Sequence, residues 1–231
     1  MEMRNVEISA LRTLRSGFLY LLVAVIVVVI AVLAGLLSII AAFGFMAAAL
    51  HRPFAEVIGA VATLLILLLV AVGIALYAIF GKIRPGMRRL SEVDNGFRIS
   101  YTGTTLILVG LVIMVLGLIV LVAAFAAAGS SPETMRGAVI GGLTLFGVLV
   151  IGAIIALIGN ILTFVVGAFL LYSKYQNSLY MAAGILFVID IAKSLVGFSG
   201  ILTLVGYVLM YIALGDTINK LSTAAPTPAQ A

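Results

Sequence analysis

Asp190 is the one acidic residue inside an apolar run of this sequence, in the stretch ILFVIDIAK at residues 185–193. If that run crosses a membrane, a carboxylate at mid-depth costs about 2.5–3.5 kcal/mol on the insertion scale, so it requires a protein or water partner. Lys193 lies three residues later on the same helical face and is the nearest candidate. Two interpretations follow: a proton or ion site, or an ion pair near the outer interface, where Lys193 extends its amine toward the headgroups.

Asn160 is a second polar side chain at mid-run, where it follows Gly159 in the fourth apolar stretch. An interhelical hydrogen bond in a membrane is worth about 0.6–2 kcal/mol, so we expect the Asn160 amide to bond a neighbouring helix. Contact of this amide with a ligand is the alternative. Asn160, Asp190 and Lys193 together form the candidate intramembrane polar site.

Residues for other kinds of chemistry are scarce. Cysteine is absent and His51 is the single histidine, which excludes iron–sulfur clusters, a bis-histidine haem, a histidine-pair zinc site and a Ser-His-Asp triad built from this chain alone. A phosphate-binding loop of the Gly-x-x-x-x-Gly-Lys-Ser/Thr type is also missing. We therefore expect no catalytic residues, no metal site and no cofactor, and a protein that is not an enzyme.

Composition indicates lipid as the solvent of this chain. Apolar residues make up 65% and charged residues 9%, against about 25% charged residues in a typical globular domain, and the mean hydropathy is +1.37. Long runs such as residues 21–40 and 57–80 contain no charge. The sequence predicts an all-α protein, a polytopic transmembrane helix bundle in the cell membrane, surrounded by lipids. The absence of tryptophan and the few Asn and Gln residues suit a thermophile.

The apolar runs predict about six spans with both termini cytoplasmic. They lie at residues 17–50, 54–80, 103–128, 137–172, 179–193 and 201–214. The first run is too long for a cleavable signal peptide, so we interpret it as a retained span. Residues 137–172 exceed one straight span and contain Gly152 and Gly159, and we favour one kinked helix over two short ones.

Polar segments flank these spans. Residues 1–16 describe either an amphipathic interfacial lead-in or the solvated start of the first membrane helix. Residues 81–102 form a basic loop in which Met87, Leu90 and Val93 recur at helical spacing, which predicts a short interfacial helix. Its cations are Lys82, Arg84, Arg88, Arg89 and Arg98. Residues 215–231 form a short cytoplasmic tail, with disorder expected from about residue 222.

Glycine spacing predicts where helices approach each other. Gly110 with Gly117, and Gly152 with Gly159, repeat at seven residues on one face, and Gly137 with Gly141 forms a small-xxx-small pair. Since glycine lets helix backbones come close in lipid, we interpret all six as packing positions.

Several short motifs carry a resemblance to a known family. They are LRTLRSG at residues 11–17, MRRL at 87–90, FRISYTGTT at 97–105 and SKYQNS at 173–178. Together they resemble an archaeal, mainly crenarchaeal, multi-spanning membrane family known only as a domain of unknown function, family nine-seven-three. The resemblance covers about residues 10–221 and implies archaeal membrane residence, without an activity or functional residues to carry over.

These observations favour a non-enzymatic membrane component, either a small scaffold or an accessory subunit of a membrane complex. Its partners would be lipids, further copies of itself or other membrane subunits, and no nucleic acid, because the net charge of +5 falls in short segments beside the apolar runs. The alternative is a transporter or channel for a proton or small solute that uses Asp190, Lys193 and Asn160.

The distribution of cations predicts the topology. One side of the membrane receives Arg4, Arg12, Arg15, the five cations of residues 81–102, Lys174 and Lys220, and the other receives Arg52, Arg136 and Lys193. The positive-inside rule then places residues 81–102 in the cytoplasm and residues 129–136 outside. Single cysteines at Ser91 and Ser130, labelled in intact cells with an impermeant reagent, check this: position 130 should react and position 91 should not. Labelling at position 91 alone would show the opposite topology.

Overall fold

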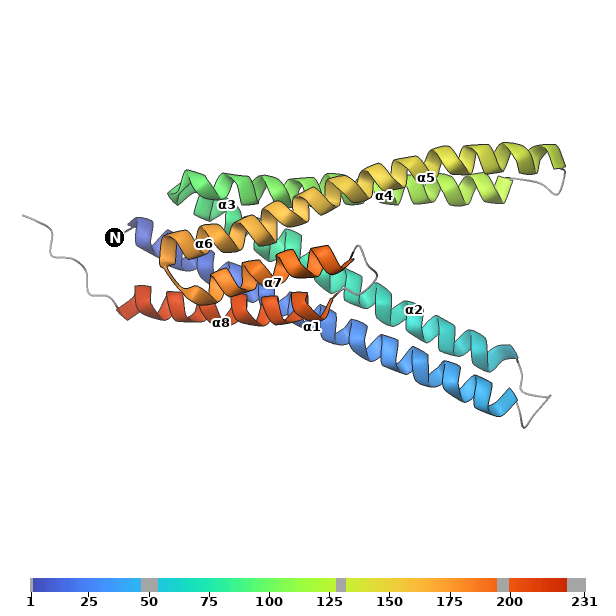
Figure 1. The fold of residues 1–231 in the computed structure, drawn as a ribbon, viewed down its shortest axis with the longest axis horizontal. Coiled ribbons are helices and arrows are strands. Elements are labelled where there is room, and N and C mark those ends of the chain that lie inside the picture. Colours follow the sequence, from blue (N-terminus) through green and yellow to red (C-terminus); the bar gives the residue numbers. More distant parts are fainter. Residues whose placement is uncertain (1, 47–53, 128–131, 195–199, 224–231) are drawn as a thin grey trace, which may run out of the picture.

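The computed structural model describes residues 2–46, 54–127, 132–194 and 200–223, and six continuous helices account for almost all of these residues (Figure 1). They are α1 (Glu2–Met46); α2 (Phe54–Leu76), continued by the π-helix η1 (Tyr77–Ile83) and α3 (Arg84–Val93); the 3-10 turn η2 (Asn95–Phe97) with α4 (Arg98–Ala127); α5 (Pro132–Asn160), continued by the π-helix η3 (Ile161–Val166) and α6 (Gly167–Tyr175); α7 (Ser178–Ser194); and α8 (Ile201–Thr223). The predicted all-α bundle of six segments is confirmed.

Five of these helices are long and apolar enough to cross a membrane, by length and composition. The exception is α7, whose 17 residues reach about 26 Å, slightly less than a hydrocarbon core of about 30 Å. By contrast, the 45 residues of α1 reach about 67 Å.

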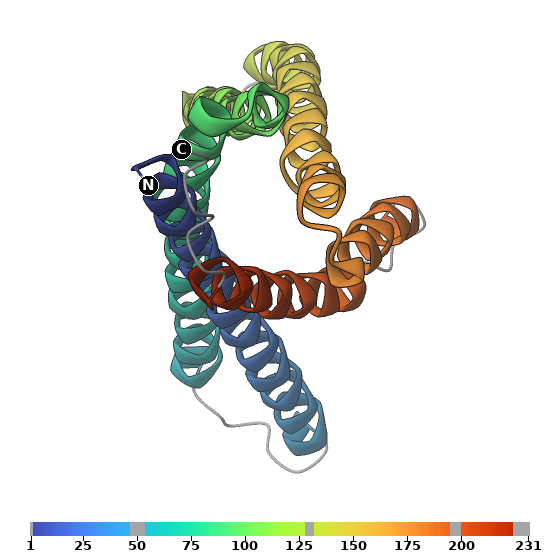
Figure 2. The same ribbon diagram turned by 90° about the vertical axis from the view of Figure 1, so that its left-hand side faces the viewer.

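Two long hairpins, α1 with α2 and α4 with α5, start side by side and then diverge (Figure 1). The end at which they meet also holds α3, α6 and the α7–α8 pair, and we call it the shared end. The start of α1 and the end of α8 lie there, joined by a hydrogen bond from Arg4 to the carbonyl of Leu221. Figure 2, viewed from the shared end, shows the helices arranged around a common centre. The α7–α8 pair stops well before the two hairpins do.

The start of α1 is part of this packed end. Ala10, Leu11 and Leu14 are fully buried, and residues 2–16 continue into the first membrane helix without a break. A Cβ at Gly86 would lie 2.7 Å from Cγ of Leu14, so α3 presses directly on α1. The lead-in is therefore continuous with the first membrane helix, as the second of the two alternatives expects, and its apolar side chains pack on protein. Its position at the membrane interface stays a prediction.

The basic segment at residues 81–102 contains the predicted short helix, α3, but this helix is not separate from the preceding span. α3 is a continuation of α2 through η1, and Met87 and Leu90 point into the core. Pro85 is the second residue of α3, directly after η1, so its missing backbone N–H falls at the junction where the π-helix changes the hydrogen-bond spacing. Asp94 ends the helix in an extended conformation and accepts a hydrogen bond from the N–H of Gly96.

Helix boundaries also move at two other places. α4 begins at Arg98, before the predicted residue 103, and α8 runs past residue 214 to Thr223, beyond which lies the remainder of the tail, outside the described residues. Residues 137–172 belong to one continuous helix, as favoured, with the π-helix η3 beginning directly after Asn160.

Glycine brings α4 and α5 into backbone contact. A Cβ at Gly110 would lie 2.5 Å from the carbonyl oxygen of Gly152, and one at Gly159 would lie 2.6 Å from the backbone nitrogen of Ile107. A Cβ at Gly117 would lie 3.1 Å from Cδ2 of Leu149 in the same interface. Gly137 and Gly141 lie in α5 outside the residues whose packing is described.

Gly110→Ala tests this backbone contact. The added methyl has no space, so the free energy of unfolding should fall by about 1–3 kcal/mol, the usual cost of overpacking. Gly147→Ala is the matched control, because it also sits mid-helix and its Cβ would meet nothing within 4 Å. Thermal unfolding in mild detergent checks both variants. Equal melting temperatures for the two would contradict the close approach of α4 and α5.

Candidate functional site

Asp190 is buried between α7 and α8, with 5% of the residue exposed. Both of its carboxylate oxygens accept from the N–H of Gly200 at 3.1 Å, and the hydroxyl of Thr203 donates to Oδ2 at 2.5 Å. Gly200 directly precedes α8 and has φ +112, a conformation that favours glycine. The carboxylate therefore lies at the N-terminus of α8, where the helix dipole and unpaired N–H groups favour a negative charge.

Lys193 does not pair with Asp190. Its side chain is exposed at the end of α7, and the described ion pairs do not include it. The expected ion pair is wrong because the N-terminus of α8 offers Asp190 two donors while it stays buried. Spacing of three residues on one helix allowed the pair but did not require it.

Asn160 makes no hydrogen bond or ion pair to either residue. It is the exposed last residue of α5, and its amide makes no hydrogen bond within the described part of the chain. Gly159 occupies the interface with α4 instead, and Asn160 lies about 100° further round the helix. The expected hydrogen bond to a neighbouring helix of this chain is therefore wrong, and within the described residues neither hydrogen bonds nor ion pairs join Asn160, Asp190 and Lys193.

Four aromatic rings fill the centre of the shared end. Phe18 of α1, Phe164 of η3, Phe187 of α7 and Tyr207 of α8 lie with ring centroids 5.6–6.1 Å apart in five contacting pairs, and we call them the aromatic cluster. The three phenylalanines are almost fully buried. Two shallow hollows on the described surface lie elsewhere, along the first turns of α1 and beside η2. The centre of the bundle is thus packed with rings.

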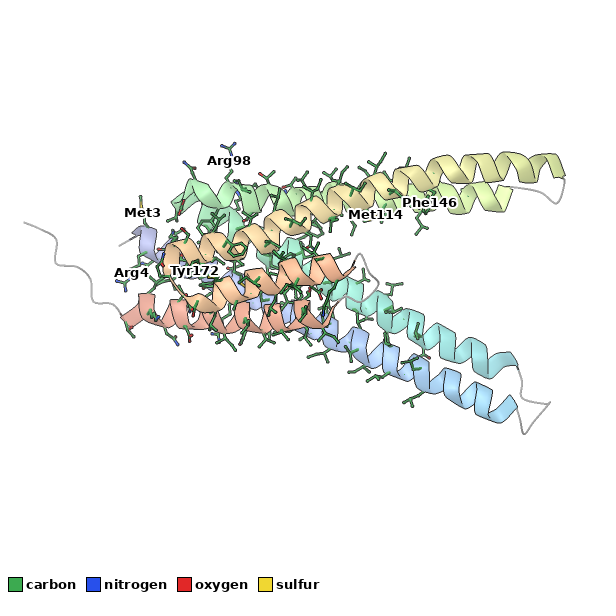
Figure 3. All side chains as sticks on the ribbon, viewed as in Figure 1. Met3, Arg4, Arg98, Met114, Phe146 and Tyr172 are labelled. Carbon is green, nitrogen blue, oxygen red and sulfur yellow. The ribbon has the colours of Figure 1, made fainter. Side chains whose placement is uncertain are left out.

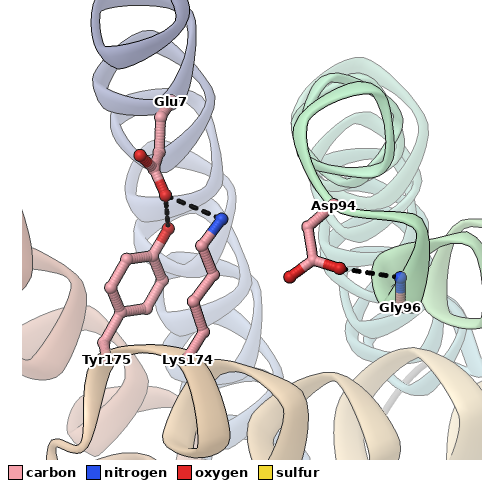
Figure 4. A network of polar contacts seen from close by, with 5 residues as sticks. All are labelled: Glu7, Asp94, Gly96, Lys174 and Tyr175. Atoms are coloured by element: carbon pink, nitrogen blue, oxygen red, sulfur yellow. Dashed lines mark hydrogen bonds and ion pairs between the residues drawn. The ribbon is translucent and has the colours of Figure 1, made fainter.

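A charged contact at the shared end was missed from the sequence. Oε1 of Glu7 meets Nζ of Lys174 at 2.8 Å and accepts from the hydroxyl of Tyr175 at 2.7 Å (Figure 4). Lys174 also lies over the ring of Phe97, 5.6 Å from its centroid. This cluster joins the start of α1 to the end of α6.

The basic residues of 81–102 gather at the same end, where Figure 3 labels Arg4 and Arg98, away from Phe146 on the α4–α5 hairpin. Lys82 and Arg84 lie over the rings of Tyr77 and Tyr101, each 5.8 Å from the centroid. Arg89 donates to the hydroxyl of Ser9 at 3.0 Å. The remaining two, Arg88 and Arg98, are exposed, and Arg88 lies 3.6 Å from the carboxylate of Glu92.

The Asp190 contact predicts a specific pattern of stabilities. Asp190→Asn and Thr203→Val each remove part of a charge-assisted hydrogen bond and should lower the free energy of unfolding by about 1–3 kcal/mol. The double variant should lose less than the sum, because both changes remove the same bond. Lys193→Met serves as the control and should not rescue Asp190→Asn; melting in detergent measures all four. Rescue of Asp190→Asn by Lys193→Met would show instead that Asp190 pairs with Lys193.

Comparison with curated proteins and with solved structures gives no significant match. A family model does match, over residues 7–231, and its description is "Protein of unknown function (DUF973)". The match covers nearly the whole chain, including the basic segment and the start of α1 that resemble this family. The chain belongs to the DUF973 family of proteins of unknown function.

Proposed function

We propose that this chain is a non-enzymatic component of the cell membrane, a scaffold or accessory subunit that packs against other membrane proteins and lipids. The observation that carries the proposal is the aromatic cluster. A solute path along the bundle axis would have to pass Phe18, Phe164, Phe187 and Tyr207, which touch each other in the centre.

The different environments of the polar groups support the same function. Transporters place coupling residues from several helices around one site near mid-membrane. Here Asp190 caps α8, whereas Asn160 is exposed on α5. The long hairpins, by contrast, offer extended apolar surface, with Leu69 75% and Ile119 59% exposed.

Transport of a proton or small solute is the second candidate, because a buried carboxylate such as Asp190 is the usual intramembrane proton carrier. Its oxygens, however, are held by the N–H of Gly200 and the hydroxyl of Thr203. Proton carriage would require these bonds to break and re-form at every cycle.

Reconstituted vesicles distinguish the two functions. The purified chain is placed in vesicles under a proton, sodium or potassium gradient, and flux is followed with an ion-sensitive dye against protein-free vesicles. The proposed function predicts no protein-dependent flux, either for the natural sequence or for Asp190→Asn. Flux that appears with the natural sequence and is abolished by Asp190→Asn would overturn the proposal in favour of transport.

A further inference from the structure

The outer face of α1 at the shared end carries a hollow lined by polar side chains. Each residue turns an α-helix by about 100°, so Ser9 and Ser16 lie about 180° and 160° round α1 from Phe18, which enters the aromatic cluster. The hollow therefore opens away from the centre of the bundle. Its lining residues, all on α1, are Asn5, Ile8, Ser9, Arg12, Thr13 and Ser16.

Two guanidinium groups border this hollow. Arg12 lines it, and Arg89 of α3 reaches across to donate to the hydroxyl of Ser9 at 3.0 Å. Both arginines are exposed, and the ion pairs of the described residues include neither, whereas Arg88 lies 3.6 Å from the carboxylate of Glu92. The hydroxyl of Ser9 accepts from Arg89, which leaves its own proton to donate. The hollow thus offers positive charge and hydrogen-bond donors to an anion.

The same face of α1 becomes apolar about two turns beyond the hollow. Leu19, Val23 and Ile26 follow Arg12 at spacings of seven, four and three residues, which keeps them on its side of the helix, and they are 44%, 40% and 52% exposed. Tyr20 lies at the boundary, as tyrosines do where a membrane helix leaves the headgroups. We call Leu19, Val23 and Ile26 the apolar strip.

We propose that the hollow binds the phosphate headgroup of an anionic phospholipid whose acyl chains lie along the apolar strip. The planar guanidinium groups of Arg12 and Arg89 donate charge-assisted hydrogen bonds to the phosphate oxygens, and the hydroxyl of Ser9 adds a further donor. We call these three residues the headgroup site. Phosphatidylglycerol suits it better than phosphatidylcholine, because the choline ammonium brings a positive charge close to both arginines.

The inference deepens the proposed function, on which it rests, by naming the class of lipid that the chain binds. A free phosphate ion would fit the headgroup site but leaves the apolar strip uncovered. An acidic protein segment would match the charge of the arginines, but the strip continues into residues 21–40, which contain no charge and suit hydrocarbon. A phospholipid alone covers both parts with one molecule.

Tryptophan fluorescence tests where the lipid lies, since the natural chain contains no tryptophan. Val23→Trp places the probe on the apolar strip, and Ile119→Trp places it on an exposed position of α4 as the matched control. Each variant is reconstituted in phosphatidylcholine vesicles with a minor fraction of phosphatidylglycerol whose brominated acyl chains quench tryptophan on contact. Brominated phosphatidylcholine at the same fraction is the reference.

Quenching by phosphatidylglycerol should exceed quenching by phosphatidylcholine at position 23 and equal it at position 119. The physical reason is that a bound headgroup holds its acyl chains beside the strip, whereas chains elsewhere exchange freely. Equal quenching by the two lipids at position 23, or the same excess at both positions, would overturn the inference.

Arg12→Gln and Arg89→Gln, each combined with Val23→Trp, test the headgroup site itself. Each should raise the phosphatidylglycerol fraction needed for half-maximal quenching roughly 10-fold, the value of one hydrogen bond to a charged group. Arg88→Gln is the matched control and should change this fraction far less, because Arg88 is already paired with Glu92. Equal losses for all three would show a diffuse attraction of lipid to the basic surface and contradict a headgroup site.

The melting temperature in detergent shows that the variants fold. Arg12→Gln should leave it unchanged, because the guanidinium of Arg12 makes no bond within the described residues. Arg89→Gln also loses the bond to Ser9, so Arg12→Gln decides the matter if Arg89→Gln is unstable. Quenching by phosphatidylglycerol that Arg12→Gln leaves as it is would contradict the role of Arg12.

Inorganic phosphate and ion flux separate the remaining outcomes. Phosphate that raises the melting temperature of the natural chain but not of Arg12→Gln, without excess quenching by phosphatidylglycerol, would identify a site for free phosphate and overturn the lipid. A chain that shows no preference for phosphatidylglycerol and carries no flux overturns the headgroup site and leaves the scaffold function in place. A chain that prefers phosphatidylglycerol at position 23 and conducts ions overturns the scaffold function and leaves the headgroup site in place.

Discussion

The contact of four aromatic rings at the shared end holds this structure together. Phe18, Phe164, Phe187 and Tyr207 come from α1, η3, α7 and α8, so one cluster joins segments separated by almost the whole chain. Offset and edge-on ring pairs contribute about 0.5–1.5 kcal/mol each beyond their buried area. In lipid, where no hydrophobic force drives helices together, such packing must supply much of the stability. The same rings close the axis of the bundle.

The two π-helices allow the helices to pack at the shared end, where the four rings meet. A π segment adds one residue to a turn and changes the direction in which the following side chains point. Within η3, Thr163 packs toward Gly103 of α4 while Phe164 enters the aromatic cluster. After η1, α3 turns Met87 and Leu90 onto α1. Beyond these segments the two hairpins diverge (Figure 1).

The sequence allowed the four long helical segments to be predicted, because uncharged runs of more than about 20 residues have one stable form in lipid. The two predicted runs at residues 179–193 and 201–214 are shorter. The sequence also indicated that Asp190 needs a partner. The partners, Gly200 and Thr203, lie at the start of α8, and no pattern in the sequence around Asp190 identifies them. Glu7 and Lys174 were missed for the same reason, being far apart in the chain. Asn160 makes no contact with α4 because Gly159 is the residue that α4 covers, and the spacing of the glycines alone does not show which neighbour of Asn160 takes that place.

Whether water enters the aromatic cluster decides most directly between a packed membrane component and a transporter. Fluorinated phenylalanine at position 164 of the full chain in lipid reports this without creating a cavity, because its 19F resonance shifts between H2O and D2O when water reaches the ring. A packed centre predicts no solvent isotope shift at Phe164, in contrast to free fluorophenylalanine. A shift approaching that of the free amino acid would place water at the centre of the bundle and contradict the closed, non-transporting structure.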